Sequence, residues 1–200
     1  MGERFRAVSC ATNAIGAFGE TLARFRPSDA LLAELKSIGD EDPSAKTTKS
    51  RDLTASVAGI VPTAWQLRRV LAQTGIDSSL RFFDLATPAS HQYLRAALTP
   101  SVTALGLGDL DFGAVVGPHR KLTQAIARHV YELRDNEDMP LFAGLRYLSR
   151  LNPEWECWAV FADRMIHTPL STVTIAPGNP DLLAVCDIYG LRLESTDSWE

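Results

Sequence analysis

The chain has 200 residues, of which 46% are hydrophobic and 22% charged, and its formal net charge is −4 at pH 7. These values are ordinary for a globular domain and exclude wholesale disorder. The acidic balance gives no electrostatic reason to bind nucleic acid, and no run reaches the roughly 18 apolar residues of a membrane span. We therefore expect one cytoplasmic domain over residues 1–200 that acts without nucleic acid and without a membrane.

The first third of the chain predicts a strand, two helices and a loop. Residues 4–12 alternate as a short strand does, and Thr12 or Asn13 can cap the helix that follows. An apolar stripe predicts that this helix extends to Pro27, with its buried side made by Ile15, Phe18, Leu22 and Phe25. A second helix over 29–38, capped by Ser28, and an exposed loop over 39–52 should follow.

The middle of the chain predicts mainly helices. Either a helix begins at Pro62 and covers 62–75, or residues 60–69 form a strand that turns into a helix; residues 80–86 fit a strand. Residues 90–98 and 120–136 have helical spacing. The second of these helices has the clearest apolar stripe, formed by Leu122, Ile126, His129 or Val130, and Leu133.

The last quarter of the chain predicts two strands, a capped helix and a final strand. Residues 157–162 and 171–176 have strand composition. Asn179 can cap a helix that Gly190 ends, which leaves 191–194 as a strand. The fold class predicted from these elements is α+β, with a mixed sheet as the core and helices flanking it.

Metal and cofactor motifs are missing from the sequence. The three cysteines, Cys10, Cys157 and Cys186, show no CxxC spacing, so we expect three buried, reduced thiols. The four histidines show no i,i+4 pairing, and no phosphate-binding glycine loop is present. We therefore expect neither a metal site nor a bound cofactor.

Three segments, taken together, carry a family resemblance. They are "FRAVSCATNAIGAFGETLARFRP" near the start, "HRKLTQAIARHVYE" in the middle, and "FAGLRYLSRLNPEWECWAVF" further on. Their order and content resemble the RES domain family, whose members have a strand, a small-residue helix that carries a glutamate, and later a serine-bearing turn before another strand. Glu20 matches the family's glutamate and Ser149 its serine.

This resemblance implies both a fold and a function. The fold would be similar to that of ADP-ribosyltransferases. Characterised toxin members of bacterial toxin–antitoxin systems destroy NAD by cleaving the bond between nicotinamide and ribose, and a cognate antitoxin protein holds them inactive. NAD would then be the substrate, the antitoxin the partner, and a homo-oligomer an open alternative.

The resemblance assigns roles to six residues. Glu20 would stabilise the positive charge that develops on the ribose, although a solvated helix residue would fit the same position. Ser149 would bind a phosphate or a ribose hydroxyl, although serine is also an ordinary turn residue. Binding of NAD would fall to a further four residues, whose other interpretation is surface charge and packing: Ser9, Arg120, Arg146 and Tyr147.

The sequence also departs from the family pattern. Ser9 stands where the family has a tyrosine, and the family's upstream arginines have no counterpart among the eight residues that precede it. We therefore expect an N-terminally truncated form, or a catalytically impaired relative that acts only through partner binding. A third hypothesis is an unrelated α/β binding module that matches these segments by accident.

Overall fold

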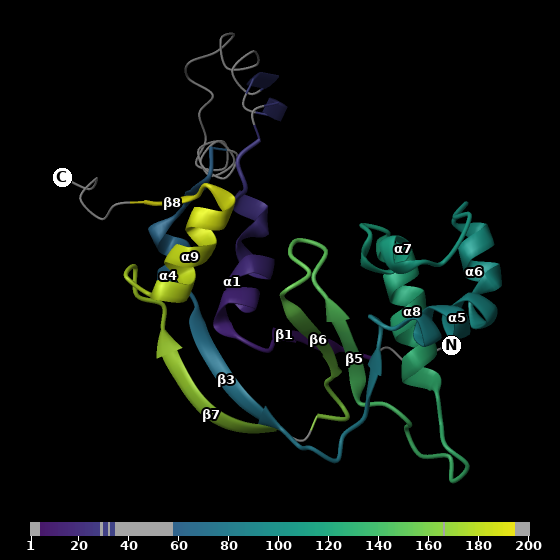
Figure 1. Ribbon diagram of the computed structural model, residues 1–200. Helices are drawn as coiled ribbons and strands as arrows, with labels where there is room; N and C mark the ends of the chain where they lie inside the picture. Colours follow the sequence, from purple (N-terminus) through teal and green to yellow (C-terminus); the bar gives the residue numbers. More distant parts are fainter. Residues whose placement is uncertain (1–4, 29, 32, 35–57, 166, 195–200) are drawn as a thin grey trace. The chain divides into compact units, whose positions relative to one another are not determined.

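The computed structural model describes residues 5–28, 30–31, 33–34, 58–165 and 167–194 (Figure 1). These residues form a mixed α+β protein, as predicted. The chain divides into two compact units: unit 1 comprises Met1–Gly16 and Thr74–Thr168, and unit 2 comprises Ala17–Gln73 and Pro169–Glu200. The expectation of a single domain stays a prediction.

Unit 1 contains a mixed four-stranded sheet in the order β1-β6-β5-β4 (Figure 1). Strand β6 is antiparallel to both of its neighbours, and β4 runs parallel to β5. Strand β5 was not predicted, because its residues were interpreted as part of a turn. The strands are β1 (Ala7–Ala11), β4 (Phe82–Asp84), β5 (Gly144–Leu148) and β6 (Glu156–Phe161).

Four helices lie together beside this sheet (Figure 1). They are α5 (Pro88–Ala97), α6 (Thr99–Ala104), α7 (Phe112–Val116) and α8 (Arg120–Glu132). Helix α8 confirms the predicted stripe through Leu122, Ile126 and Val130, whereas Leu133 lies just beyond its end. These helices and one face of the sheet share a single hydrophobic core, which includes Phe83, Leu94, Leu145 and Phe161.

The pleat of β5 separates its side chains onto two faces. Leu145 joins the hydrophobic core and Tyr147 packs against it, so this face of the sheet is the core face. Arg146 lies between them and therefore projects to the opposite face, which we call the polar face. At Gly144 a Cβ atom would stand 2.3 Å from the Ala159 carbonyl oxygen, so only glycine fits where β5 approaches β6.

Unit 2 contains several short elements, together with parts of three elements that are divided between the two units. Helix α1, strand β3 and strand β7 each have residues in both units. Strand β2 pairs in parallel with β8, and β3 pairs with β7. The elements are α1 (Ala14–Leu22), η1 (Ala23–Phe25), β2 (Ile60–Val61), α4 (Thr63–Leu67), β3 (Val70–Ile76), β7 (His167–Thr174), α9 (Pro180–Tyr189) and β8 (Arg192–Leu193).

The core of unit 2 is formed by its helices and by the β2–β8 pair. Its buried residues include Phe18, Leu22, Phe25, Val61, Trp65, Leu182, Val185 and Tyr189. The predicted caps of α9 are confirmed: the Leu182 amide donates to Asn179 Oδ1 over 3.0 Å, and Gly190 ends the helix with φ of 64°. A left-handed φ favours glycine at that position.

The remaining expectations have mixed outcomes. The second alternative, a strand that turns into a helix over 60–69, is confirmed by β2 and the short helix α4, whereas strand β3 was not predicted. The Leu31 amide donates to Ser28 Oγ over 3.4 Å, whereas residues 35–38 and the predicted loop over 39–52 lie outside the described residues. Within the ranges that the structure describes, no helix has the length and apolar character needed to cross a membrane.

The thiols and possible metal ligands can be followed over the same ranges. Cys157 and Cys186 are buried, as expected, but Cys10 is only half-buried. Burial raises the pKa of the Cys10 and Cys186 thiols. No cluster of three or more histidine, cysteine, aspartate or glutamate side chains that could hold a metal ion occurs in the part of the chain that the structure describes.

Candidate functional site

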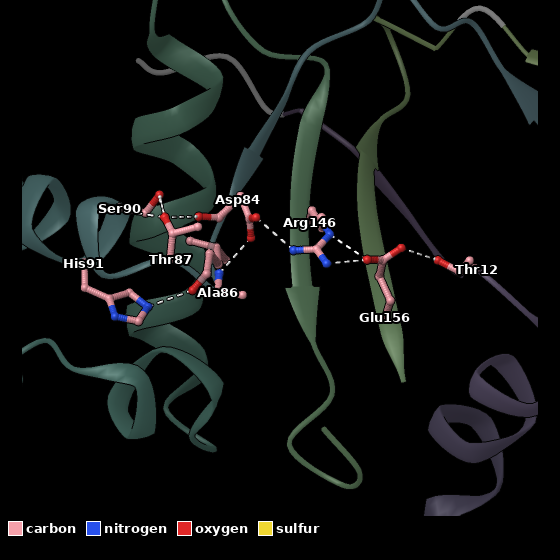
Figure 2. A network of polar contacts seen from close by, with 9 residues as sticks. Thr12, Asp84, Ala86, Thr87, Ser90, His91, Arg146 and Glu156 are labelled. Atoms are coloured by element: carbon pink, nitrogen blue, oxygen red, sulfur yellow. Dashed lines mark hydrogen bonds and ion pairs between the residues drawn. The ribbon is translucent and has the colours of Figure 1, made fainter. Parts of the chain in front are cut away.

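A network of polar side chains crosses the polar face of the unit 1 sheet, with Arg146 at its centre (Figure 2). The Arg146 guanidinium donates through Nε to Glu156 Oε2 over 2.6 Å and through Nη1 to Asp84 Oδ2 over 2.8 Å. A further ion pair joins its Nη2 to Glu156. Asp84 lies directly opposite Arg146 in the β4–β5 register, and Glu156 lies diagonally across from it on β6. Cross-strand neighbours on one face are close enough for such contacts.

The network continues beyond the three charged residues to the segment after β1. The Thr12 hydroxyl donates to Glu156 Oε1 over 2.7 Å, and it accepts a hydrogen bond from Trp158 Nε1 over 2.9 Å. The Trp158 ring also meets Phe82 edge to face at 5.0 Å. These contacts tie β4, β6 and the residue after β1 together on the polar face.

At the other end of the network, Asp84 orders the start of helix α5. Its Oδ1 accepts a hydrogen bond from the Ala86 amide over 2.9 Å. The helix cap follows directly, because the Thr87 hydroxyl oxygen accepts from the Ser90 amide over 3.3 Å. His91 Nε2 lies 2.7 Å from the Leu85 carbonyl oxygen. Figure 2 shows this continuous row of polar groups running from His91 to Thr12.

The electrostatics of the network favour its charged form. Hydrogen bonding to Glu156, with a further contribution from Asp84, raises the pKa of Arg146. The Thr12 hydroxyl, followed by Arg146, lowers the pKa of Glu156. One guanidinium faces two carboxylates, so the three groups together carry one net negative charge. A phosphate that approached Arg146 would have to displace carboxylates that already hold it.

Ser149 occupies the turn after β5 and is almost fully buried, with 2% of its surface exposed. Its Oγ accepts a hydrogen bond from the Leu151 amide over 3.0 Å, and its own amide donates to the Trp155 carbonyl over 2.9 Å. These are the contacts of a turn residue. Its expected role in binding a ribose or a phosphate stays a prediction.

The other residues predicted in unit 1 lie on different surfaces. Ser9 is exposed on the edge strand β1, opposite Ala159, and so belongs to the same face as Tyr147. Arg146 projects to the other face. Arg120 is exposed at the first position of α8. Unit 1 alone therefore does not gather these four side chains at one point.

Glu20 belongs to unit 2, where helix α1 presents it to solvent. Phe18 and Leu22 on the same helix are buried, which confirms that the glutamate lies off the apolar stripe. The position directly after the strand bearing Ser9 fits the glutamate of the family resemblance, and the exposure equally fits a solvated helix residue, the alternative interpretation. Glu20 is therefore accessible to a ligand.

Sequence reasoning missed most of the polar network. Asp84, Glu156, Thr12 and Trp158 were not among the predicted site residues. The sequence did contain a signal. Arg146 and Glu156 lie on either side of the same turn, as the paired residues of a β-hairpin do. It became visible only once residues 144–148 were recognised as a strand.

Comparison of the chain with models of protein families, with curated proteins and with solved structures finds no match in any of the three. The class that the structure itself defines is a mixed α+β protein with a polar network on one face of its sheet. The resemblance to the RES domain family, and the ADP-ribosyltransferase-like fold that it implies, stay predictions.

Proposed function

We propose that this chain is a RES-type domain that cleaves NAD at the bond between nicotinamide and ribose. The observation that carries the proposal is the solvent-exposed Glu20 on α1, directly after β1, in a segment whose residues resemble the family's glutamate-bearing helix. The later serine-bearing segment also leads into a strand, β6, as the resemblance implied. The fold would be of the ADP-ribosyltransferase-like kind, and a cognate antitoxin would be the natural inhibitor.

The chemistry follows from what an exposed carboxylate can do beside a ribose. As the bond from C1′ to the nicotinamide nitrogen breaks, its electron pair leaves with nicotinamide and positive charge develops on the ribose. The Glu20 carboxylate would stabilise that charge electrostatically. If water is the acceptor, its oxygen bonds to C1′ and one proton is released, which gives ADP-ribose and free nicotinamide.

The experiment is an assay of nicotinamide release from NAD by the purified chain. We expect Glu20→Gln to lower the rate by about 100-fold or more, as loss of a group that stabilises the transition state does. Glu132→Gln, which removes an exposed carboxylate from α8, is the matched control and should keep the wild-type rate. Background rates in all three proteins would overturn the proposal.

A second candidate is a catalytically impaired relative that acts only by binding a partner protein. Two observations favour this candidate. Two carboxylates hold the Arg146 guanidinium, and the Ser149 hydroxyl accepts a hydrogen bond within its own turn. In this case the chain would bind a cognate antitoxin with a defined stoichiometry and release no nicotinamide. Release that depends on Glu20 would exclude this candidate.

A further inference from the structure

Two arginines of unit 2, Arg24 and Arg69, differ from Arg146 in what surrounds them. Arg24 lies over the Phe25 ring with its guanidinium carbon 4.9 Å from the ring centre, and Arg69 lies over Trp65 at the same distance. Within the described residues, neither arginine makes a salt bridge with a carboxylate. Both side chains are exposed. No ion pair within these described ranges therefore compensates their charges.

The two arginines belong to one aromatic stack. Phe25 and Trp65 meet edge to face with their ring centres 6.2 Å apart, and both rings are buried. A guanidinium that lies over a ring keeps its planar edge of N–H donors available for another group. Arg69 uses one donor locally, from Nη1 to the Trp65 carbonyl over 3.2 Å, which further fixes its position.

A third donor in the same stack lacks an acceptor. Trp65 is 6% exposed, and its indole Nε1 is the one buried side-chain polar atom without a hydrogen bond in the part of the chain that the structure describes. Buried donors are nearly always paired, so a missing partner at this position calls for an explanation. The atom is enclosed in this structure, so an anion held by the neighbouring arginines would supply an acceptor once a covering side chain moves aside.

We propose that Arg24 and Arg69 form an anion site in unit 2 that binds the diphosphate of a small ligand. Two separate guanidinium groups joined through one stack suit a ligand with two adjacent anionic groups better than a single carboxylate. Insofar as the inference rests on the proposed function, that ligand is NAD. Arg24 follows Glu20 by four residues, which places the phosphate-binding group about one helical turn from the carboxylate.

The guanidinium groups that bind phosphate would come from the end of the α1–η1 segment and from the residues just after α4. Arg146 would keep its structural ion pairs.

The first test is calorimetric titration with inorganic pyrophosphate at constant ionic strength. We expect Arg24→Gln and Arg69→Gln each to weaken binding by at least about tenfold, because each removes charge-assisted hydrogen bonds. Arg68→Gln is the matched control: Arg68 is exposed, is next to Arg69 in the sequence and lies over no ring in the described residues, so binding should change less than about twofold. Equal losses in all three variants, equal affinity for sulfate, or no binding to the wild type would overturn the proposal.

A local readout supports the same test. The indole N–H signal of Trp65, assigned by its loss in Trp65→Phe, should shift when pyrophosphate is added to the wild type and to Arg68→Gln. It should not shift in Arg69→Gln. A signal that stays in place while the wild type binds pyrophosphate would place the anion elsewhere and contradict the proposal.

Failure of this site and failure of the proposed function can be told apart. If pyrophosphate binds through Arg24 and Arg69 but NAD is not cleaved, the site stands and the function falls. If NAD is cleaved in a manner that depends on Glu20, while Arg24→Gln and Arg69→Gln keep the wild-type KM, the function stands and the site is overturned.

Discussion

Arg146 in unit 1 and the pair Arg24 and Arg69 in unit 2 have different surroundings. On the polar face of the unit 1 sheet, Arg146 is paired with Asp84 and Glu156. In unit 2, Arg24 and Arg69 lie over aromatic rings and have no carboxylate partner within the described residues. The guanidinium of Arg146 connects strands, whereas we propose that those of Arg24 and Arg69, ordered by rings, bind an anion. The residue type alone does not separate these roles, but the surroundings do.

The largest expected effect is the loss of Arg146. Arg146→Met keeps much of the side-chain volume but leaves Asp84 and Glu156 as two half-buried carboxylates without a cation. We expect the free energy of unfolding to fall by about 3 kcal/mol in urea denaturation. Arg69→Met is the matched substitution in unit 2 and should cost less than about 1 kcal/mol, since it removes packing on Trp65 and one hydrogen bond from an exposed side chain. Equal costs would break the comparison between the two groups.

Glu156→Gln should have a smaller effect that depends on pH. Its pKa is lowered in the folded protein from an ordinary value of 4.5, so its stabilisation is complete above that value and is lost as pH falls through the folded pKa. At neutral pH we expect the substitution to cost about 1 to 2 kcal/mol. The wild type should lose its advantage over the variant as denaturation is followed from about pH 7 down to about pH 3. A constant difference across that range would contradict the assignment.

Thr12→Val tests the far end of the same network. It removes the hydroxyl that donates to Glu156 and accepts from Trp158. Because these groups are partly exposed and water can replace the hydroxyl, we expect a loss of only about 0.5 to 1 kcal/mol. The pKa of Glu156, followed by carboxyl NMR, should rise. Thr12→Ser should restore the pKa, which would tie the effect to the hydroxyl.

We expect Arg69→Lys to have the smallest effect on stability. The substitution separates the contribution of the charge of Arg69 from that of its planar guanidinium. Charge is kept but the planar fork over Trp65 is lost. The free energy of unfolding should change by less than about 0.5 kcal/mol. Pyrophosphate affinity should nonetheless fall by about threefold or more, because a bidentate contact becomes a point charge. Unchanged affinity would show that charge alone, and not the ordered fork, makes the site.

Much of the fold could be predicted from local patterns. The caps at Asn13 and Asn179, the apolar stripe of α8 and the glycine that ends α9 each depend on neighbouring residues in the sequence. Strand β5 was not predicted from the sequence, because "GLRYL" mixes a core residue, an arginine and a tyrosine, and its pairing partners lie elsewhere in the chain. Strand identity there is decided by tertiary pairing, which local composition does not contain.

The site was less predictable than the fold for the same reason. The sequence shows Arg146 but not the two carboxylates that hold it, since Asp84 reaches it from a distant strand. Ser149 was predicted from a resemblance, while its burial depends on how the turn packs. The ring contacts of Arg24 and Arg69 require Phe25 and Trp65 to meet, although they are forty residues apart in the sequence. Apart from the pairing of Arg146 with Glu156, which flank one turn, spacing along the chain could not reveal these contacts.

The central claim is that this chain cleaves NAD, with Glu20 acting on the reaction and the unit 2 arginines acting on binding. The most direct measurement is steady-state nicotinamide release over a range of NAD concentrations for the wild type, Glu20→Gln and Arg69→Gln. We predict a large fall in kcat with little change in KM for Glu20→Gln, and a raised KM with kcat largely kept for Arg69→Gln. Absence of turnover in the wild type, or equal kcat in the wild type and Glu20→Gln, would contradict the account.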